Sequence, residues 1–160
     1  MGTGSGAIAV SLAAELPFAL VIALDLSLPA LDIARHNARK HAQSHIQFVQ
    51  ANLLEPFRTQ FDLICANLPY IPTDKLNALP VSDWEPHLAL DGGENGLDVI
   101  SQLIKQARSR LAPGGSMLLE IEASLGETAL AAAQTAFPQA QLAIHQDLAQ
   151  HDRIIEITLG

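Results

Sequence analysis

Short apolar runs alternate along the chain with segments of helical periodicity. A continuous apolar run of this length is typical of a strand that is buried on both faces of a parallel sheet. The pattern predicts strands over Phe18–Leu24, Ile46–Gln50, Phe61–Ala66 and Ser116–Glu122. Two further strands, Gln141–Gln146 and Arg153–Leu159, are separated by a short link, which suggests an antiparallel pair at the end of the chain.

The intervening segments have the spacing of amphipathic helices. Ser27–Ala42 has apolar residues at 28, 31, 34 and 38, with basic residues at 35, 39 and 40. Ser27 suits the N-cap and Pro29 the first turn of this helix. The other predicted helices are Ala7–Glu15, Leu97–Leu111 and Gly126–Ala136, and a turn is expected at Pro113–Gly115.

This alternation predicts an α/β fold with an open sheet and helices on both faces. In a doubly wound fold a strand precedes the first glycine-rich loop. Here the loop begins at Gly2. We therefore expect residues 1–160 to form one domain that is truncated at its N-terminus and lacks the first, central strand.

Composition narrows the class of protein. The chain has 160 residues, a net charge of −8 and one cysteine. No apolar run reaches the ~18 residues of a membrane span, and no signal peptide is visible. An acidic chain lacks the basic footprint of a non-specific nucleic-acid binder. We expect a cytoplasmic monomer that binds neither membrane nor nucleic acid directly. No metal site is expected, because His41 and His45 have no third ligand nearby.

The first candidate site is the glycine loop Gly2-Thr3-Gly4-Ser5-Gly6. Glycines at this spacing let the backbone approach a ligand closely before a helix begins. Asp25 follows 19 residues after Gly6, at the carboxyl end of the next predicted strand. A carboxylate there can accept hydrogen bonds from both ribose hydroxyls. The alternative role for Asp25 is to cap the following helix.

The second candidate site is Asn67-Leu68-Pro69-Tyr70, which follows the strand Phe61–Ala66. It therefore lies at the carboxyl edge of the sheet, where ligands bind in such folds. The Asn67 amide oxygen and the Leu68 carbonyl are two acceptors that can hold a planar NH₂ group. Pro69 stiffens the backbone, and Tyr70 can lie against the flat face of that group. The alternative is an ordinary turn after a strand.

Together these motifs resemble the class I S-adenosylmethionine-dependent methyltransferases that methylate planar nitrogens at an Asn-Pro-Pro-Tyr site. A second motif is similar to a signature of the release factor glutamine methyltransferase family. It comprises Glu85-Pro86-His87-Leu88-Ala89-Leu90-Asp91-Gly92-Gly93 and Asn95-Gly96-Leu97-Asp98. Asp147-Leu148 with Asp152-Arg153 also matches the C-terminal end of that family. Its members carry an N-terminal helical domain that is not found in these residues.

The resemblance implies a Rossmann-like sheet and the cofactor S-adenosyl-L-methionine. The expected reaction is methyl transfer to the side-chain amide nitrogen of the glutamine in the GGQ motif of peptide chain release factors. Gly2, Thr3, Gly4, Ser5 and Gly6 would face the methionine part, Asp25 the ribose, and Asn52 and Leu53 the adenine. Asn67, Leu68, Pro69 and Tyr70 would be catalytic and bind the substrate glutamine, and Asn67 would also border the cofactor.

Two departures from the family pattern stand out. Leu68 occupies the place of the first motif proline, although its carbonyl is retained. Leu53 stands where the family often has an aromatic residue, and it stacks less well on a ring. Glu85 is a candidate substrate contact, or alternatively a residue that caps its loop.

Three other functions stay open at this point. A glutamine methyltransferase that acts on a ribosomal protein would differ only in its partner. A DNA adenine N6-methyltransferase shares both motifs but needs a basic cleft in which to flip a base. A truncated remnant without catalytic activity is the third possibility.

Overall fold

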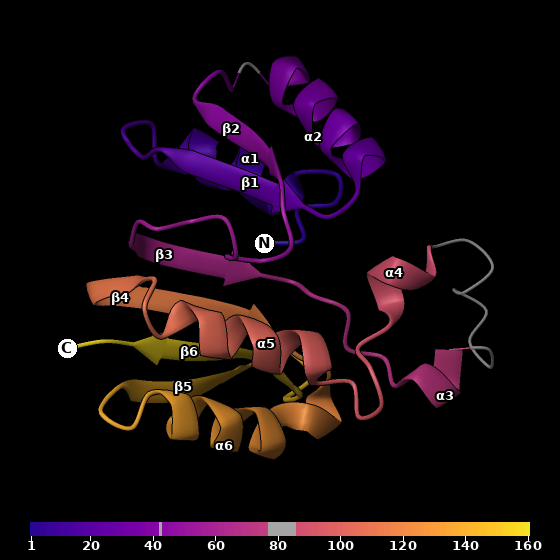
Figure 1. Cartoon of the computed structure of the whole chain (residues 1–160), viewed down its shortest axis with the longest axis vertical. Helices are drawn as coiled ribbons and strands as arrows, with labels where there is room; N and C mark the ends of the chain where they lie inside the picture. The colour runs from indigo at the N-terminus through magenta and orange to yellow at the C-terminus, as the bar shows by residue number, and fades with distance from the viewer. Residues whose placement is uncertain (42, 77–85) are drawn as a thin grey trace. The chain divides into compact units, whose positions relative to one another are not determined.

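The computed structural model describes residues 1–41, 43–76 and 86–160. They form two compact units, Met1–Phe57 and Arg58–Gly160. Each unit carries its own sheet, with helices that pack against it (Figure 1). Within the described residues, no helix has both the length and the apolar character that crossing a membrane requires.

The first unit pairs two parallel strands, β1 (Val21–Asp25) and β2 (Ile46–Gln50), in the register Val21↔Ile46 to Asp25↔Gln50. Helices α1 (Ala7–Glu15) and α2 (Leu28–Lys40) share one core with these strands. Small residues such as Ala9, Ala13 and Ala38 dominate this core, so the helices can approach the sheet closely. Both helices follow the predicted segments.

The predicted first strand begins too early in the sequence. β1 starts at Val21 rather than Phe18, because Phe18 is fully exposed and Leu20 is 65% exposed. Ser27 caps α2 as expected: its side-chain oxygen accepts a hydrogen bond from the Ala30 N–H at 3.3 Å. The carboxyl end of β1 therefore leads through a capped turn directly into α2.

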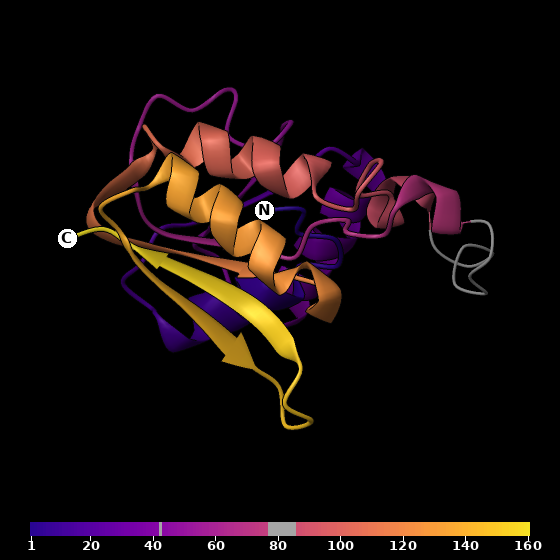
Figure 2. The same cartoon turned by 90° about the horizontal axis from the view of Figure 1, so that it is seen from below.

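The second unit has a mixed sheet in the order β3-β4-β6-β5. β3 (Phe61–Ala66) and β4 (Leu111–Glu120) are parallel. β6 (Asp152–Thr158) runs antiparallel both to β4 and to β5 (Gln141–Gln146). The expected antiparallel pair at the end of the chain is confirmed, and Figure 2 shows these two strands side by side.

Two long helices, α5 (Asp98–Ala107) and α6 (Gly126–Ala136), cover one face of this second sheet (Figure 2). The helix residues Leu103 and Ala133 and the strand residues Met117, Ile155 and Ile157 are almost completely inaccessible. The helix predicted to reach Leu111 ends at Ala107, because a turn closed by the Arg110 N–H on the Ala107 carbonyl stops it.

The glycine-proline turn lies inside β4 rather than before it. Phe61 of β3 pairs with Leu111, whereas Leu63 pairs with Ser116, so the register shifts across the segment that contains Gly114. Gly114 has a φ of 72°, which favours glycine. The predicted change of direction is thus present as a bulge in the strand.

Candidate functional site

The glycine loop of the first unit has a backbone that ordinary residues rarely adopt. Gly2, Gly4 and Gly6 have φ values of 56°, 53° and 83°. A Cβ at Gly6 would lie 2.9 Å from the Ala34 Cβ, so this glycine lets α1 begin against α2. A Cβ at Gly4 would meet nothing within 4 Å. The loop is therefore anchored at Gly6 and open to a ligand at Gly4.

Asp25 joins this loop to the end of β1. Its Oδ2 accepts a hydrogen bond from the Gly4 N–H at 2.9 Å, and its Oδ1 accepts one from the Ser27 N–H, also at 2.9 Å. The predicted glycine loop and the predicted carboxylate thus lie together. Asp25 also organises the start of α2, as in the alternative reading of this residue. Each carboxylate oxygen has a second lone pair with which it can accept from a ligand hydroxyl.

Asn52 and Leu53 follow β2 at the same end of the two-stranded sheet. The Ala51 N–H donates to the Asp25 carbonyl at 3.0 Å, which brings this segment beside Asp25. The exposed Asn52 side chain donates from Nδ2 to Glu55 Oε1 at 2.8 Å, so its Oδ1 is the atom that can accept from a ligand. The amine of an adenine is a donor of this kind.

Leu53 has an unusual conformation. Its φ is 51°, in the left-handed region that costs an L residue ~1–2 kcal/mol. Its side chain is only 6% exposed. A ligand beside this segment would therefore meet little of the Leu53 side chain. Backbone strain of this kind is concentrated at functional sites in proteins.

In the second unit, Asn67–Tyr70 lead out of β3 into a cavity of about 230 Å³. Its lining consists of Asn67, Leu68, Pro69, Tyr70, Ile71, Ala89 and Leu90. The Leu68 side chain is only 4% exposed, so the carbonyl is the group through which this residue can serve a polar ligand. The four residues predicted from sequence therefore form most of one concave site.

The second motif holds this site in place by close backbone packing. A Cβ at Gly92 would lie 2.7 Å from the Tyr70 Cα and 2.8 Å from the Gly96 Cα. Gly96 has a φ of 73°, and a Cβ there would overlap the Tyr70 carbonyl oxygen. Only glycine fits both positions. The sequence marked these glycines as a family signature but not as the support on which Tyr70 lies.

Hydrogen bonds close the same contact. The Ile71 N–H donates to the Leu90 carbonyl at 3.0 Å, and the Gly92 N–H donates to the Ile71 carbonyl at 2.8 Å. Asp91 Oδ1 accepts from Thr73 Oγ1 at 2.7 Å and from the Gly93 N–H at 2.9 Å. The hydrogen bond from Thr73, followed by that from Gly93, lowers the pKa of the Asp91 carboxyl.

Glu85, the remaining candidate for substrate contact, lies outside the described residues. Among the residues that are described, no three His, Cys, Asp or Glu side chains gather where they could hold a metal ion. The predicted residues are therefore grouped within each unit: the glycine loop, Asp25, Asn52 and Leu53 in the first, and Asn67–Tyr70 in the second.

Residues 1–81 match the family model described as a methyltransferase domain. The chain is 41% identical over 97% of its length to a release factor glutamine methyltransferase from Deinococcus radiodurans, of which it covers 55%. It is 40% identical over 99% of its length to the release factor glutamine methyltransferase of Cereibacter sphaeroides, of which it covers 58%. The chain thus spans somewhat more than half the length of these relatives.

Among solved structures, the ribosomal protein L11 methylase of Lactobacillus delbrueckii subsp. bulgaricus superposes with a TM-score of 0.73 at 21% identity. The superposition covers 99% of this chain and 67% of that one. This similarity shows the fold, and it confirms the predicted Rossmann-like α/β class.

Proposed function

This chain belongs to the methyltransferase-domain family, and we propose that it transfers a methyl group from S-adenosylmethionine to a release factor. The acceptor is the side-chain amide nitrogen of the glutamine in the GGQ motif. One observation carries this proposal: Asn67, Leu68, Pro69 and Tyr70 line a single cavity of about 230 Å³. That volume lies below the ~300–1,000 Å³ typical of sites for drug-sized ligands, and it suits a single side chain.

The first unit has the features that the cofactor needs. Gly4 leaves open space beside a backbone in the left-handed conformation, so a ligand can approach the main chain there. Asp25, which is partly buried at the end of β1, can accept the ribose hydroxyls while it holds the Gly4 N–H. Asn52 offers Oδ1 to the adenine amine. When bound, S-adenosylmethionine supplies a methyl group on an electron-poor sulfonium sulfur.

The residues of the second unit act on the acceptor. An amide nitrogen is a weak nucleophile because its lone pair is delocalised into the carbonyl. The Asn67 amide oxygen and the Leu68 carbonyl accept the two N–H bonds of the glutamine carboxamide and fix its plane. They also stabilise the positive charge that grows on nitrogen during transfer. Tyr70 packs against the carboxamide face.

No general base is required before the methyl group moves. The amide nitrogen carries its protons into the transition state, and the two oxygens hold them there by hydrogen bonding. One proton leaves afterwards to solvent through the open side of the cavity. The chain's contribution is therefore alignment and electrostatic stabilisation, and we assign residues 1–160 to the catalytic part of the enzyme.

Labelled methyl transfer tests this proposal. The full chain is incubated with methyl-labelled S-adenosylmethionine and a release factor, with a GGQ-to-GGA release factor as the substrate control. We expect label on the release factor with the GGQ motif and none on the GGA control. When duplex DNA is offered as a substrate instead, label on the DNA would contradict the proposal, as would the absence of label on the release factor.

A pair of variants then tests the site. Asn67→Ala removes one of the two acceptors, and loss of a single such group costs roughly 10²–10³-fold in kcat. Gln139→Ala removes an exposed side-chain amide between α6 and β5, at the opposite edge of the sheet, and serves as the matched control. Calorimetry should show that Gln139→Ala binds S-adenosylmethionine like the unchanged chain and that Asn67→Ala loses only a modest part of the affinity. Unchanged kcat for Asn67→Ala would refute the assigned role.

A further inference from the structure

The turn between β5 and β6 reaches the same edge of the second sheet as Asn67. Ala66 of β3 pairs with Leu119 of β4, and Leu119 pairs with Ile155 of β6. Adjacent strands lie ~4.8 Å apart, so Ile155 is roughly 10 Å from Ala66 across the sheet. Leu68 follows Ala66 by two residues, and Arg153 precedes Ile155 by two residues. Because β6 runs antiparallel to β3, Arg153 and Leu68 lie at the same edge of the sheet. The register thus places Arg153 beside the candidate substrate site.

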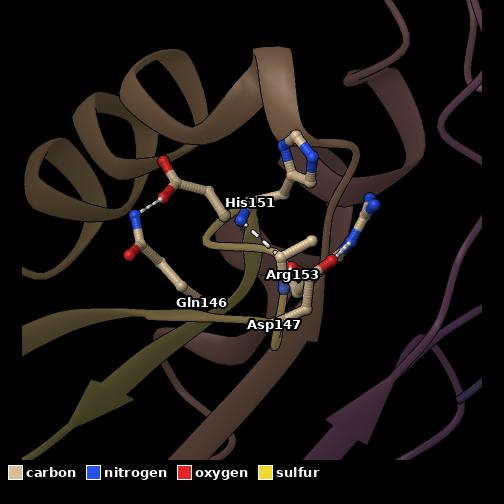
Figure 3. A network of polar contacts seen from close by, with 6 residues as sticks. Gln146, Asp147, His151 and Arg153 are labelled. Atoms are coloured by element: carbon tan, nitrogen blue, oxygen red, sulfur yellow. Dashed lines mark hydrogen bonds and ion pairs between the residues drawn. The ribbon is translucent and has the colours of Figure 1, made fainter.

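Arg153 is held in one orientation by Asp147. Its Nε donates to Asp147 Oδ2 at 2.8 Å, and Asp147 Oδ1 accepts from the N–H groups of Ala149 and His151 at 2.8 and 3.0 Å (Figure 3). The Arg153 carbonyl also accepts from the Ile121 N–H at 2.8 Å. Both the main chain and the side chain of Arg153 are therefore fixed before any substrate arrives.

The rest of the guanidinium group points past Asp147, as Figure 3 shows. Within the part of the chain that is described, Asp147 is its one side-chain partner. The hydrogen bond that Arg153 donates to Asp147 raises the pKa of Arg153 most, and Coulombic interactions with Asp147, Tyr70 and Glu122 also raise it. Tyr70 also lines the cavity, which agrees with the position that the strand register gives Arg153.

The surroundings select the kind of group that Arg153 can bind. The carboxylates of Asp147 and Glu122 already offset the guanidinium charge, and Asp152 lies in the same turn, where its Oδ1 accepts from Gln146. A phosphate or carboxylate ligand would meet this excess of negative charge and be repelled. A neutral carbonyl oxygen accepts from the remaining N–H groups without that cost. The electrostatics favour a peptide backbone over a nucleic-acid backbone.

We propose that Arg153 is a specificity-determining residue whose terminal N–H groups bind backbone carbonyl oxygens of the polypeptide that carries the target glutamine. Asp147 is its positioning residue. This inference rests on the proposed function, and it assigns a role to the C-terminal motif that the catalytic residues leave unexplained.

Steady-state kinetics of the full chain with a release factor test this inference. Arg153→Ala should raise KM for the release factor roughly tenfold, the loss expected for a hydrogen bond from a charged donor. Its kcat and its affinity for S-adenosylmethionine should stay near the unchanged values. Arg108→Ala, an exposed arginine beyond α5 at the opposite edge, is the matched control and should leave KM unchanged.

A double-mutant cycle separates positioning from folding. Asp147→Ala should raise KM less than Arg153→Ala does, and the double variant should match Arg153→Ala alone, because both changes act through one contact. Additive effects, or a fall in kcat at constant KM, would overturn the inference.

Three further results would overturn the inference. Tight binding of duplex DNA that disappears in Arg153→Ala would assign the guanidinium to phosphate and overturn the peptide assignment. Absence of labelling by the unchanged chain overturns the proposed function and this inference together. Labelling with equal KM for Arg153→Ala and Arg108→Ala overturns the inference alone.

Discussion

Gly96 offers a sharp test of how the second motif supports the candidate substrate site. The Gly96→Ala substitution places a methyl group where the Tyr70 carbonyl oxygen lies, at a φ of 73°. Gly114 has nearly the same φ, 72°, but a Cβ there meets nothing within 4 Å. Gly114→Ala is therefore a matched control that carries the same backbone strain without the steric overlap.

The expected loss of folding stability has two causes, backbone strain and steric overlap. A left-handed conformation costs an L residue ~1–2 kcal/mol, and both variants share that cost. Overpacking against a fixed neighbour adds ~1–3 kcal/mol, and only Gly96→Ala bears it. Each kcal/mol shifts the midpoint of thermal unfolding by roughly 2–4 °C for a chain of this size. Gly96→Ala should therefore unfold roughly 2–12 °C below Gly114→Ala.

Thermal and urea unfolding of the two variants give this difference directly. Both glycines lie in the unit Arg58–Gly160, so one transition reports on both. Methyl transfer is then measured below both midpoints. Gly96→Ala should lose kcat, because a shift of ~1 Å in a substrate-positioning group can cost 10²-fold, whereas Gly114→Ala should keep it. Equal midpoints together with equal kcat would refute the idea that Gly96 supports Tyr70.

Three further predictions concern Asp25, Ser27 and Asp91. Asp25→Asn should weaken S-adenosylmethionine binding in calorimetry by roughly tenfold or more, because it disturbs charged hydrogen bonds to the loop; unchanged affinity would exclude Asp25 from the site. Ser27→Ala should cost ~1 kcal/mol in urea unfolding through loss of the α2 cap, and a loss near zero would mean that the cap is not stabilising. The lowered pKa of Asp91 means that its stabilising effect is complete above 3.8 and disappears as the pH falls through the lowered value. Asp91→Asn should therefore flatten the acid side of a plot of the free energy of unfolding against pH. Thr73→Val should return the pKa of Asp91 toward 3.8 in an NMR titration. An unchanged plot and an unchanged pKa would contradict this linkage.

The elements that the sequence predicted well are those whose local signals agree. α2 combines an N-cap serine, a proline in the first turn and a regular apolar stripe, and it forms within two residues of its predicted ends. The misplaced start of β1 has the opposite cause. Phe18 and Leu20 continue an apolar run, yet they lie exposed, and apolar character alone does not say which residues are covered.

The register between β3 and β4 could not be predicted from the sequence. The Pro113–Gly115 segment carries an ordinary turn signal, and only its pairing with β3 shows that β4 continues through it as a bulge. The candidate sites were easier to locate, because they follow strands whose ends the apolar runs mark. Asn67 and Asp25 both come directly after such a run, and both lie where the carboxyl ends of parallel strands place them.

What the sequence did not predict is how these sites are supported, because support depends on contacts between segments far apart in the chain. Tyr70 lies on Gly92 and Gly96, more than twenty residues away, and Arg153 is fixed by a carboxylate that also shapes a turn. In both cases the residue that meets substrate would be held by one that does not. Alignment in this second unit therefore depends on its backbone packing, which is why a single methyl group at Gly96 should be more damaging than the same group at Gly114.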